Sequence, residues 1–224
     1  PLFAAVGWDA RAGESDNTAV LRTDLISALT DLGDPDIVAE NRARFEQYLA
    51  NPAELGAEAR HSVLRNIAVR ADKAVWDRLR EMAKTAPSEL ERLELYKLLG
   101  APQDQQLAQR ALALVLSDEI PKTIRPEVIA SVSEYHPEMA LDFSIEHWES
   151  LSKILEVSSA QRFVPSLVGL SADLRTVDKL DAFAAAHFPP NARQDYVLAG
   201  ARVRYLAKVR AERIPEVGRW LATR

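Results

Sequence analysis

Apolar residues recur at intervals of three and four along most of the chain, which is the spacing of an amphipathic helix. The clearest example is the segment 135–155, where two adjacent rows of the expected helix are apolar. Its main stripe consists of Leu141, Ile145, Trp148, Leu151 and Leu155. Pro137 suits the first turn, because a proline there loses no hydrogen bond. A helix with so wide an apolar surface is expected to pack between other helices and to organise the domain.

The first predicted helix covers residues 17–32, with Ser15 or Asp16 as its N-cap and Gly33 as its stop. Its inward positions are expected to be Leu21, Leu25, Ala28, Leu29 and Leu32. Residues 1–16 show little period, so they are interpreted as a short, irregular, extended lead-in to this helix.

Further predicted helices follow along the chain and can be taken in pairs as helical hairpins. The six hairpins open near residues 17, 57, 88, 126, 159 and 191. A new pair roughly every 30–40 residues is typical of HEAT-like and armadillo-like arrays. The sequence therefore predicts an all-α fold, a curved α-solenoid of about six antiparallel helix pairs, with a compact irregular bundle as the second candidate. The last pair is expected to be a helix over 192–211 followed by one over 216–221.

Composition sets the broad class of the protein. The 224 residues are 47% hydrophobic and 27% charged, which is typical of a soluble globular protein, and they contain no cysteine, which favours the cytoplasm slightly. The net charge of -5 argues against a nucleic-acid partner. No apolar run approaches the roughly 20 residues that span a membrane, and no signal peptide is recognised. The start at Pro1 suggests that the chain is a fragment of a larger protein.

The sequence holds no recognisable catalytic apparatus. Its histidines are His61, His136, His147 and His187. None of them has a second zinc ligand one helical turn away, as an H-E-x-x-H site requires, so structural roles are expected and no metal site is predicted. The sequence also lacks a G-x-S-x-G elbow, a P-loop and a dinucleotide fingerprint. No catalytic residue is therefore assigned.

Charged residues give three candidate binding features. The acidic row of the central helix consists of Glu138, Asp142, Glu146 and Glu149, and it either faces solvent or lines a groove for a cationic peptide. Arg162 lies in the predicted first turn of its helix, where the helix dipole disfavours a cation. Such a residue either forms a structural ion pair or holds a carboxylate elsewhere. The basic row of the last long helix pairs with acidic neighbours, faces water or binds a peptide carboxylate. It consists of Arg202, Arg204, Lys208, Arg210 and Arg213.

Several stretches, taken in order, resemble the C-terminal helical domain of aminopeptidase N-type zinc metallopeptidases, in the endoplasmic-reticulum and puromycin-sensitive branch. The matching stretches are VGWDARAGESDNTAVLR, AVWDRLREMA, ERLELYKLLGAPQD, FSIEHWESL, LRTVDKLDAF and VGRWLA. They extend over nearly the whole chain. His147 departs from the pattern, since the family more often has Asn there.

The resemblance implies that residues 1–224 are a single C-terminal domain of a larger multidomain aminopeptidase. It implies zinc in a missing catalytic domain, which would be the intramolecular partner, and no cofactor in this chain. It also implies a lid that closes over the active site and limits the access of peptide substrates, whose N-terminal residues the enzyme removes. By position, Arg162 matches a family arginine that faces the catalytic cleft, so it is the expected substrate contact. The isolated chain is expected to be inactive.

A second hypothesis needs only the repeat pattern. A stand-alone array of helix pairs would bind a partner protein on its concave face, without any enzyme. Neither hypothesis involves nucleic acid or a membrane.

Overall fold

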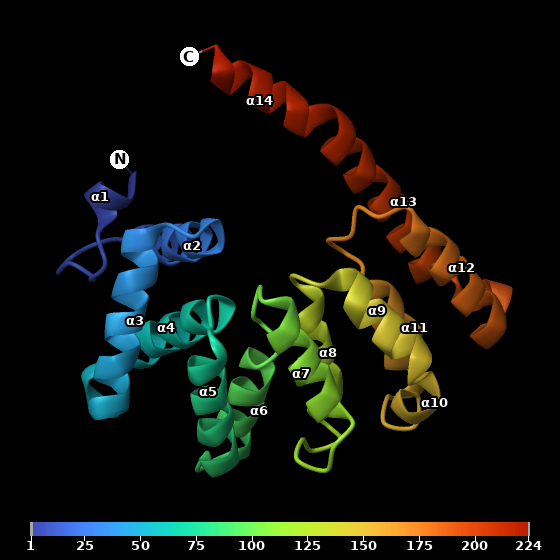
Figure 1. Ribbon diagram of the computed structural model, residues 1–224, viewed down its shortest axis with the longest axis horizontal. Coiled ribbons are helices and arrows are strands. Elements are labelled where there is room, and N and C mark those ends of the chain that lie inside the picture. Colours follow the sequence, from blue (N-terminus) through green and yellow to red (C-terminus); the bar gives the residue numbers. More distant parts are fainter. Residues whose placement is uncertain (1, 224) are drawn as a thin grey trace. The chain divides into compact units, whose positions relative to one another are not determined.

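The computed structural model describes residues 2–223, and for residues 54, 57, 58, 157 and 158 it describes the backbone alone. Within this range every regular element is helical, which confirms the all-α class (Figure 1). None of the helices in the described range is both long and apolar enough to cross a membrane. The chain forms two compact units, Pro1–Asp104 and Gln105–Arg224.

The first unit contains six α-helices, of which neighbours in sequence pack against each other. They are α1 (Leu2–Val6), α2 (Asp16–Leu32), α3 (Pro35–Ala50), α4 (Ala57–Val69), α5 (Lys73–Thr85) and α6 (Glu89–Leu98). Helix α4 contacts α2, α3, α5 and α6, so it is the centre of this unit. Large side chains such as Phe45, Ile67, Trp76 and Leu79 are fully buried between these helices.

The N-terminal segment differs from the extended lead-in that the sequence predicted. Residues 2–6 form α1, which packs on α2, and the loop after α1 brings Glu14 against Arg22. The Arg22 guanidinium donates two hydrogen bonds to the Glu14 carboxylate, of 2.6 and 2.5 Å, and a third to the Gly7 carbonyl. These bonds satisfy the charge of Arg22, which allows its side chain to be buried.

Burial of Arg22 also overturns the predicted inward face of α2. The residues of α2 that are buried are Arg22, Ile26 and Thr30. Leu21 and Leu32, which were expected to face inward, are exposed, and Leu32 is 81% exposed. The prediction was wrong because it placed every leucine inside and could not foresee the partner of Arg22.

The second unit contains eight α-helices. They are α7 (Gln105–Val115), α8 (Arg125–Ser133), α9 (Pro137–Glu146), α10 (Trp148–Leu151), α11 (Val157–Ser166), α12 (Arg175–His187), α13 (Gln194–Lys208) and α14 (Ile214–Ala222). Helices α7, α8 and α9 pack in sequence order, α11 packs on both α9 and α13, and α12 packs on α13. Packing between sequence neighbours is what a helical array requires, but the predicted curved solenoid of the whole chain stays a prediction.

The central segment is not one continuous helix, as the sequence predicted, because it ends and restarts at His147. His147 has φ -104 and ψ 17, and it separates α9 from the single turn of α10. Trp148 is buried beyond this break, and its ring lies edge-on to Phe183 of α12, with 5.0 Å between the ring centroids. The segment therefore does pack between other helices, as expected.

The last predicted hairpin is also wrong. Residues 209–213 form a π-helical turn that joins α13 to α14, so the backbone stays helical from Gln194 to Ala222. Pro215 cannot donate a backbone hydrogen bond, and the wider π turn before it accommodates this loss. Helix α14 consequently extends α13 and does not fold back on it (Figure 1).

Candidate functional site

Arg162 is the residue that the sequence singled out, and it lies on the exposed side of α11. Because α11 begins at Val157, Arg162 lies in its second turn, so the predicted first-turn position and the dipole argument are wrong. Its side chain is 81% exposed, and its Nε lies 3.7 Å from Oδ2 of Asp195 on α13. An ion pair so exposed contributes little to stability. The guanidinium therefore remains accessible to a carboxylate from outside the unit.

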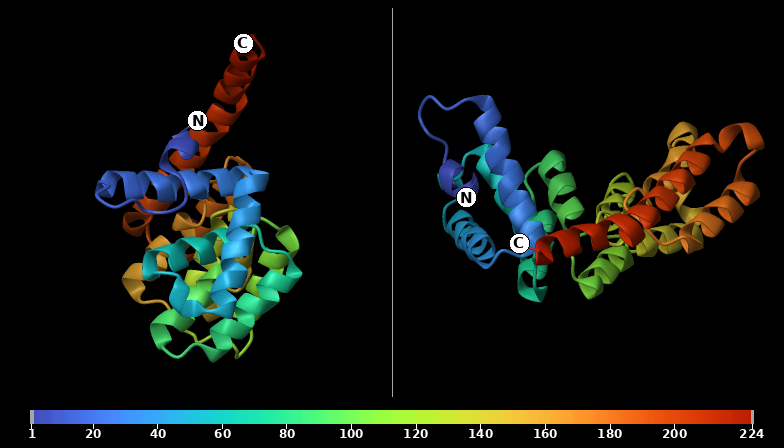
Figure 2. Two further views of the ribbon diagram at one scale, coloured as in Figure 1. Left: turned by 90° about the vertical axis from the view of Figure 1, so that its left-hand side faces the viewer. Right: turned by 90° about the horizontal axis from the view of Figure 1, so that it is seen from above.

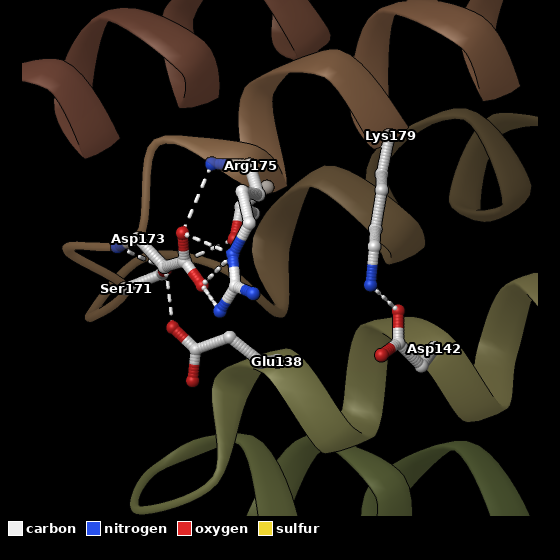
Figure 3. Close-up of polar contacts among 7 residues, drawn as sticks. Glu138, Asp142, Ser171, Asp173, Arg175 and Lys179 are labelled. Carbon is white, nitrogen blue, oxygen red and sulfur yellow. Dashed lines mark hydrogen bonds and ion pairs between the residues drawn. The ribbon is translucent and has the colours of Figure 1, made fainter.

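A second polar region joins α9 to the start of α12, and we call it the α9–α12 polar cluster (Figure 3). It consists of Glu138, Asp142, Ser171, Asp173, Arg175, Thr176 and Lys179. At its centre the Ser171 hydroxyl donates to Oε1 of Glu138 over 2.5 Å and lies 3.2 Å from the Thr176 hydroxyl. Ser171 and Thr176 are buried. No local spacing in the sequence links these residues as a whole, because they come from two separated segments.

The rest of the cluster is a set of ion pairs at the surface. Arg175 binds both carboxylate oxygens of Asp173, and these bonds hold the pKa of the Asp173 carboxyl below its usual range and raise the pKa of the Arg175 guanidinium. Lys179 binds Asp142 across the two helices. The amide of Asp173 donates to the Ser171 hydroxyl and the amide of Arg175 donates to Asp173, so local hydrogen bonds order the loop before α12. A local signal for this loop was present in the sequence, since Ser and Asp just before a helix are typical of capping turns.

An open groove of about 470 Å³ lies between α9 and α12, next to the cluster. Its lining residues are Asp142, Ile145, Glu146, Lys179, Ala182, Phe183, Ala186 and His187. Two members of the predicted acidic row, Asp142 and Glu146, thus stand at a groove. Glu149 does not, because it is 93% exposed and pairs with Lys153 four residues later. Only half of the acidic row therefore has the geometry of a peptide-binding rim.

The predicted basic row does not form one anion site. Arg202 donates to the Gly169 carbonyl at 2.7 Å, and Arg213 pairs with Glu216 at 3.0 Å. Arg204 and Lys208 line a different open groove between α12 and α13. Among the described residues, the row is therefore divided among local contacts, of which only the pair between Arg213 and Glu216 is a close ion pair with an acidic neighbour.

Two of the predicted structural histidines lie against aromatic rings. His147 packs on Phe143 with 4.6 Å between the centroids of the tilted rings, and His187 packs on Phe183 in the same way at 4.5 Å. Among the residues whose placement is described, no three His, Asp or Glu side chains come together as a metal site would need. Ser171 is buried and bound to a carboxylate, so its hydroxyl orders a loop and is not presented to a substrate.

One family model and several plant aminopeptidases match most of this chain. A family model described as the ERAP1-like C-terminal domain matches residues 1–203. Aminopeptidase M1-C of Oryza sativa subsp. japonica is 26% identical over 197 residues, which are 85% of this chain and 22% of that protein. Aminopeptidase M1 of Arabidopsis thaliana is 26% identical over 198 residues, which are 84% of this chain and 22% of that protein. The chain thus spans less than a quarter of the length of these relatives.

Proposed function

Because the chain belongs to the ERAP1-like C-terminal domain family, we propose that it is the non-catalytic helical domain of a zinc-dependent aminopeptidase. The observation that carries the proposal is the family match over residues 1–203. Such an enzyme removes N-terminal residues from peptides, and this domain closes over its active site and limits which peptides enter. Its partners are then the catalytic domain of the same polypeptide and the peptide substrate.

The proposal places the zinc outside these 224 residues. This is supported by the short share of the plant relatives that the chain covers, which leaves most of such a protein for a catalytic domain. It is also supported by the lack of a group of metal-ligating side chains among the described residues. The proposed location in the cytoplasm would be tested by fractionation of the source cells.

Arg162 is the proposed contact to the far end of a bound peptide. Its exposure and its loose pairing with Asp195 support this role, because an incoming carboxylate would replace a weak partner. In the whole enzyme, Arg162→Ala should raise KM for peptides that are long enough to reach it and leave kcat nearly unchanged. Single-residue fluorogenic substrates, which cannot reach Arg162, should show an unchanged KM.

The matched control is Lys153→Ala, which removes another exposed cation from the same unit. This control should leave KM unchanged for all peptide lengths. If Arg162→Ala has no effect on KM at any length, the contact role is refuted. If Arg162→Ala raises KM for the single-residue substrate as strongly as for long peptides, Arg162 does not contact the far end of the peptide.

A further inference from the structure

Helix α14 carries an apolar face that is largely exposed. Ile214, Val217, Trp220 and Leu221 are spaced by three, three and one, so they lie on one side of the helix. Each of the four side chains is more than half exposed, and no residue of α14 is buried. Figure 2 shows α14 continuing along the direction of α13, so that α13 cannot fold over this face.

This end of the chain is poorly suited to be a helix in water on its own. It contains Pro215 and Gly218, the two residue types that disfavour a helix interior most, and its apolar face includes the β-branched Ile214 and Val217. Most of the stability of a helix in a protein comes from the packing of its apolar face, and the exposed end of this long helix lacks such packing. Helix α14 is therefore expected to be stabilised by another protein surface that covers its apolar face.

We propose that the apolar face of α14 docks on the part of the same polypeptide that lies outside these 224 residues, and so latches this domain to the rest of the enzyme. This inference rests on the proposed function. The chain covers only 22% of the matched plant aminopeptidases, so a large remaining part is available as the docking surface. Arg213 and Glu216 pair with each other beside the face, so the partner surface is expected to be apolar and not charged.

A second copy of the chain fits this face less well. A stable complex between separate chains buries about 1,000 Å² or more in total, which a single helix of nine residues from each copy does not supply. A tethered contact needs much less area, because the covalent connection raises the effective concentration of the two surfaces. The small size of the face thus favours an intramolecular partner.

Hydrogen exchange of the backbone amides of residues 209–222 tests the inference. We expect these amides to exchange at least about tenfold more slowly in the whole protein than in the isolated 224-residue chain. In the whole protein, the double substitution Val217→Glu and Trp220→Glu should restore the fast exchange. The matched control is Leu32→Glu, which places a charge at another exposed apolar position and should change nothing at residues 209–222.

Equal exchange rates in the whole protein and the isolated chain would overturn the inference, because the face would then be uncovered. Slow exchange already in the isolated chain would also overturn the inference, because the surface that covers α14 would then belong to residues 1–224. Protection that appears only with a doubled mass in light scattering would assign the face to a second copy. Protection that appears only with phosphatidylserine vesicles would assign it to a lipid surface. None of these readings depends on peptidase activity, so failure of the latch and failure of the proposed function can be told apart.

Discussion

The Ser171 hydroxyl donates a 2.5 Å hydrogen bond to the Glu138 carboxylate and so ties the loop before α12 to the first turn of α9. Ser171→Ala should lower the free energy of unfolding by about 1–3 kcal/mol, because a part-buried hydrogen bond to a charged group is lost. Urea titration of the isolated chain measures the change. The control Ser150→Ala, at an exposed position on α10, should stay within about 0.5 kcal/mol of the parent.

The pairing of Glu14 with Arg22 should make stability depend on acid pH. The hydrogen bonds from Arg22 lower the pKa of the Glu14 carboxyl from 4.5 to about 2. A carboxyl whose pKa is depressed by folding adds stability above its unfolded pKa, and this contribution is lost as the pH falls from about 4.5 towards 2. The urea midpoint of the parent chain should therefore fall more steeply between pH 5 and pH 3 than that of Glu14→Gln. Parallel slopes for the two proteins would contradict the assignment.

Trp148 and Trp220 offer a matched pair of substitutions. Trp148 is 9% exposed and packs on Phe183, so Trp148→Ala should destabilise the isolated chain by about 3–5 kcal/mol. Trp220 is 53% exposed on α14, so Trp220→Ala should have little effect in the isolated chain. Thermal unfolding followed by circular dichroism compares them, and an unchanged midpoint for Trp148→Ala would show that this residue is not a core anchor.

Alanine substitutions at Gly33 and Gly13 distinguish the strain of a positive φ from a steric clash of the added Cβ. Both have positive φ, of 77 and 78, which disfavours alanine by roughly 1 kcal/mol. At Gly33 a Cβ would also lie 2.7 Å from Nη2 of Arg70, whereas the space around Gly13 is open. The Arg70 guanidinium lies close to Gly33 because it donates hydrogen bonds to the Thr30 and Asp31 carbonyls at the end of α2. Gly33→Ala should thus be clearly more destabilising than Gly13→Ala in urea titration.

Local signals in the sequence were sufficient to place most helix ends. Ser15 accepts a hydrogen bond from the amide of Thr18, and Gly33 ends α2 with positive φ, both as predicted. Each of these features depends on residues only a few positions apart, so a linear pattern contains the necessary information.

Features that depend on distant partners could not be predicted in this way. The burial of Arg22 needs Glu14, which lies in a segment that had no apolar period. The π turn before α14 replaced the expected hairpin, because Pro215 can be accommodated inside a helix when the preceding turn widens. Leu32 was expected inside from the apolar spacing of its helix, but the packing of α2 left it exposed.

The candidate site was predicted in part. The sequence drew attention to Arg162 and to the acidic row of α9, and the structure places Asp142 and Glu146 at a groove. The bond between Ser171 and Glu138 joins residues 33 positions apart, so no spacing rule could have found it. Arg162 was noticed through a dipole argument that the true start of α11 does not support.

A non-catalytic domain of a zinc aminopeptidase has no peptidase activity when it is separated from its catalytic domain. The release of aminomethylcoumarin from an N-terminal aminoacyl substrate is measured for the whole protein and for the isolated chain, with equimolar zinc and with a chelator. We expect turnover by the whole protein that the chelator abolishes and added zinc restores, and no turnover by the isolated chain above a buffer control. Turnover by the isolated chain, or none by the zinc-loaded whole protein, would contradict the account.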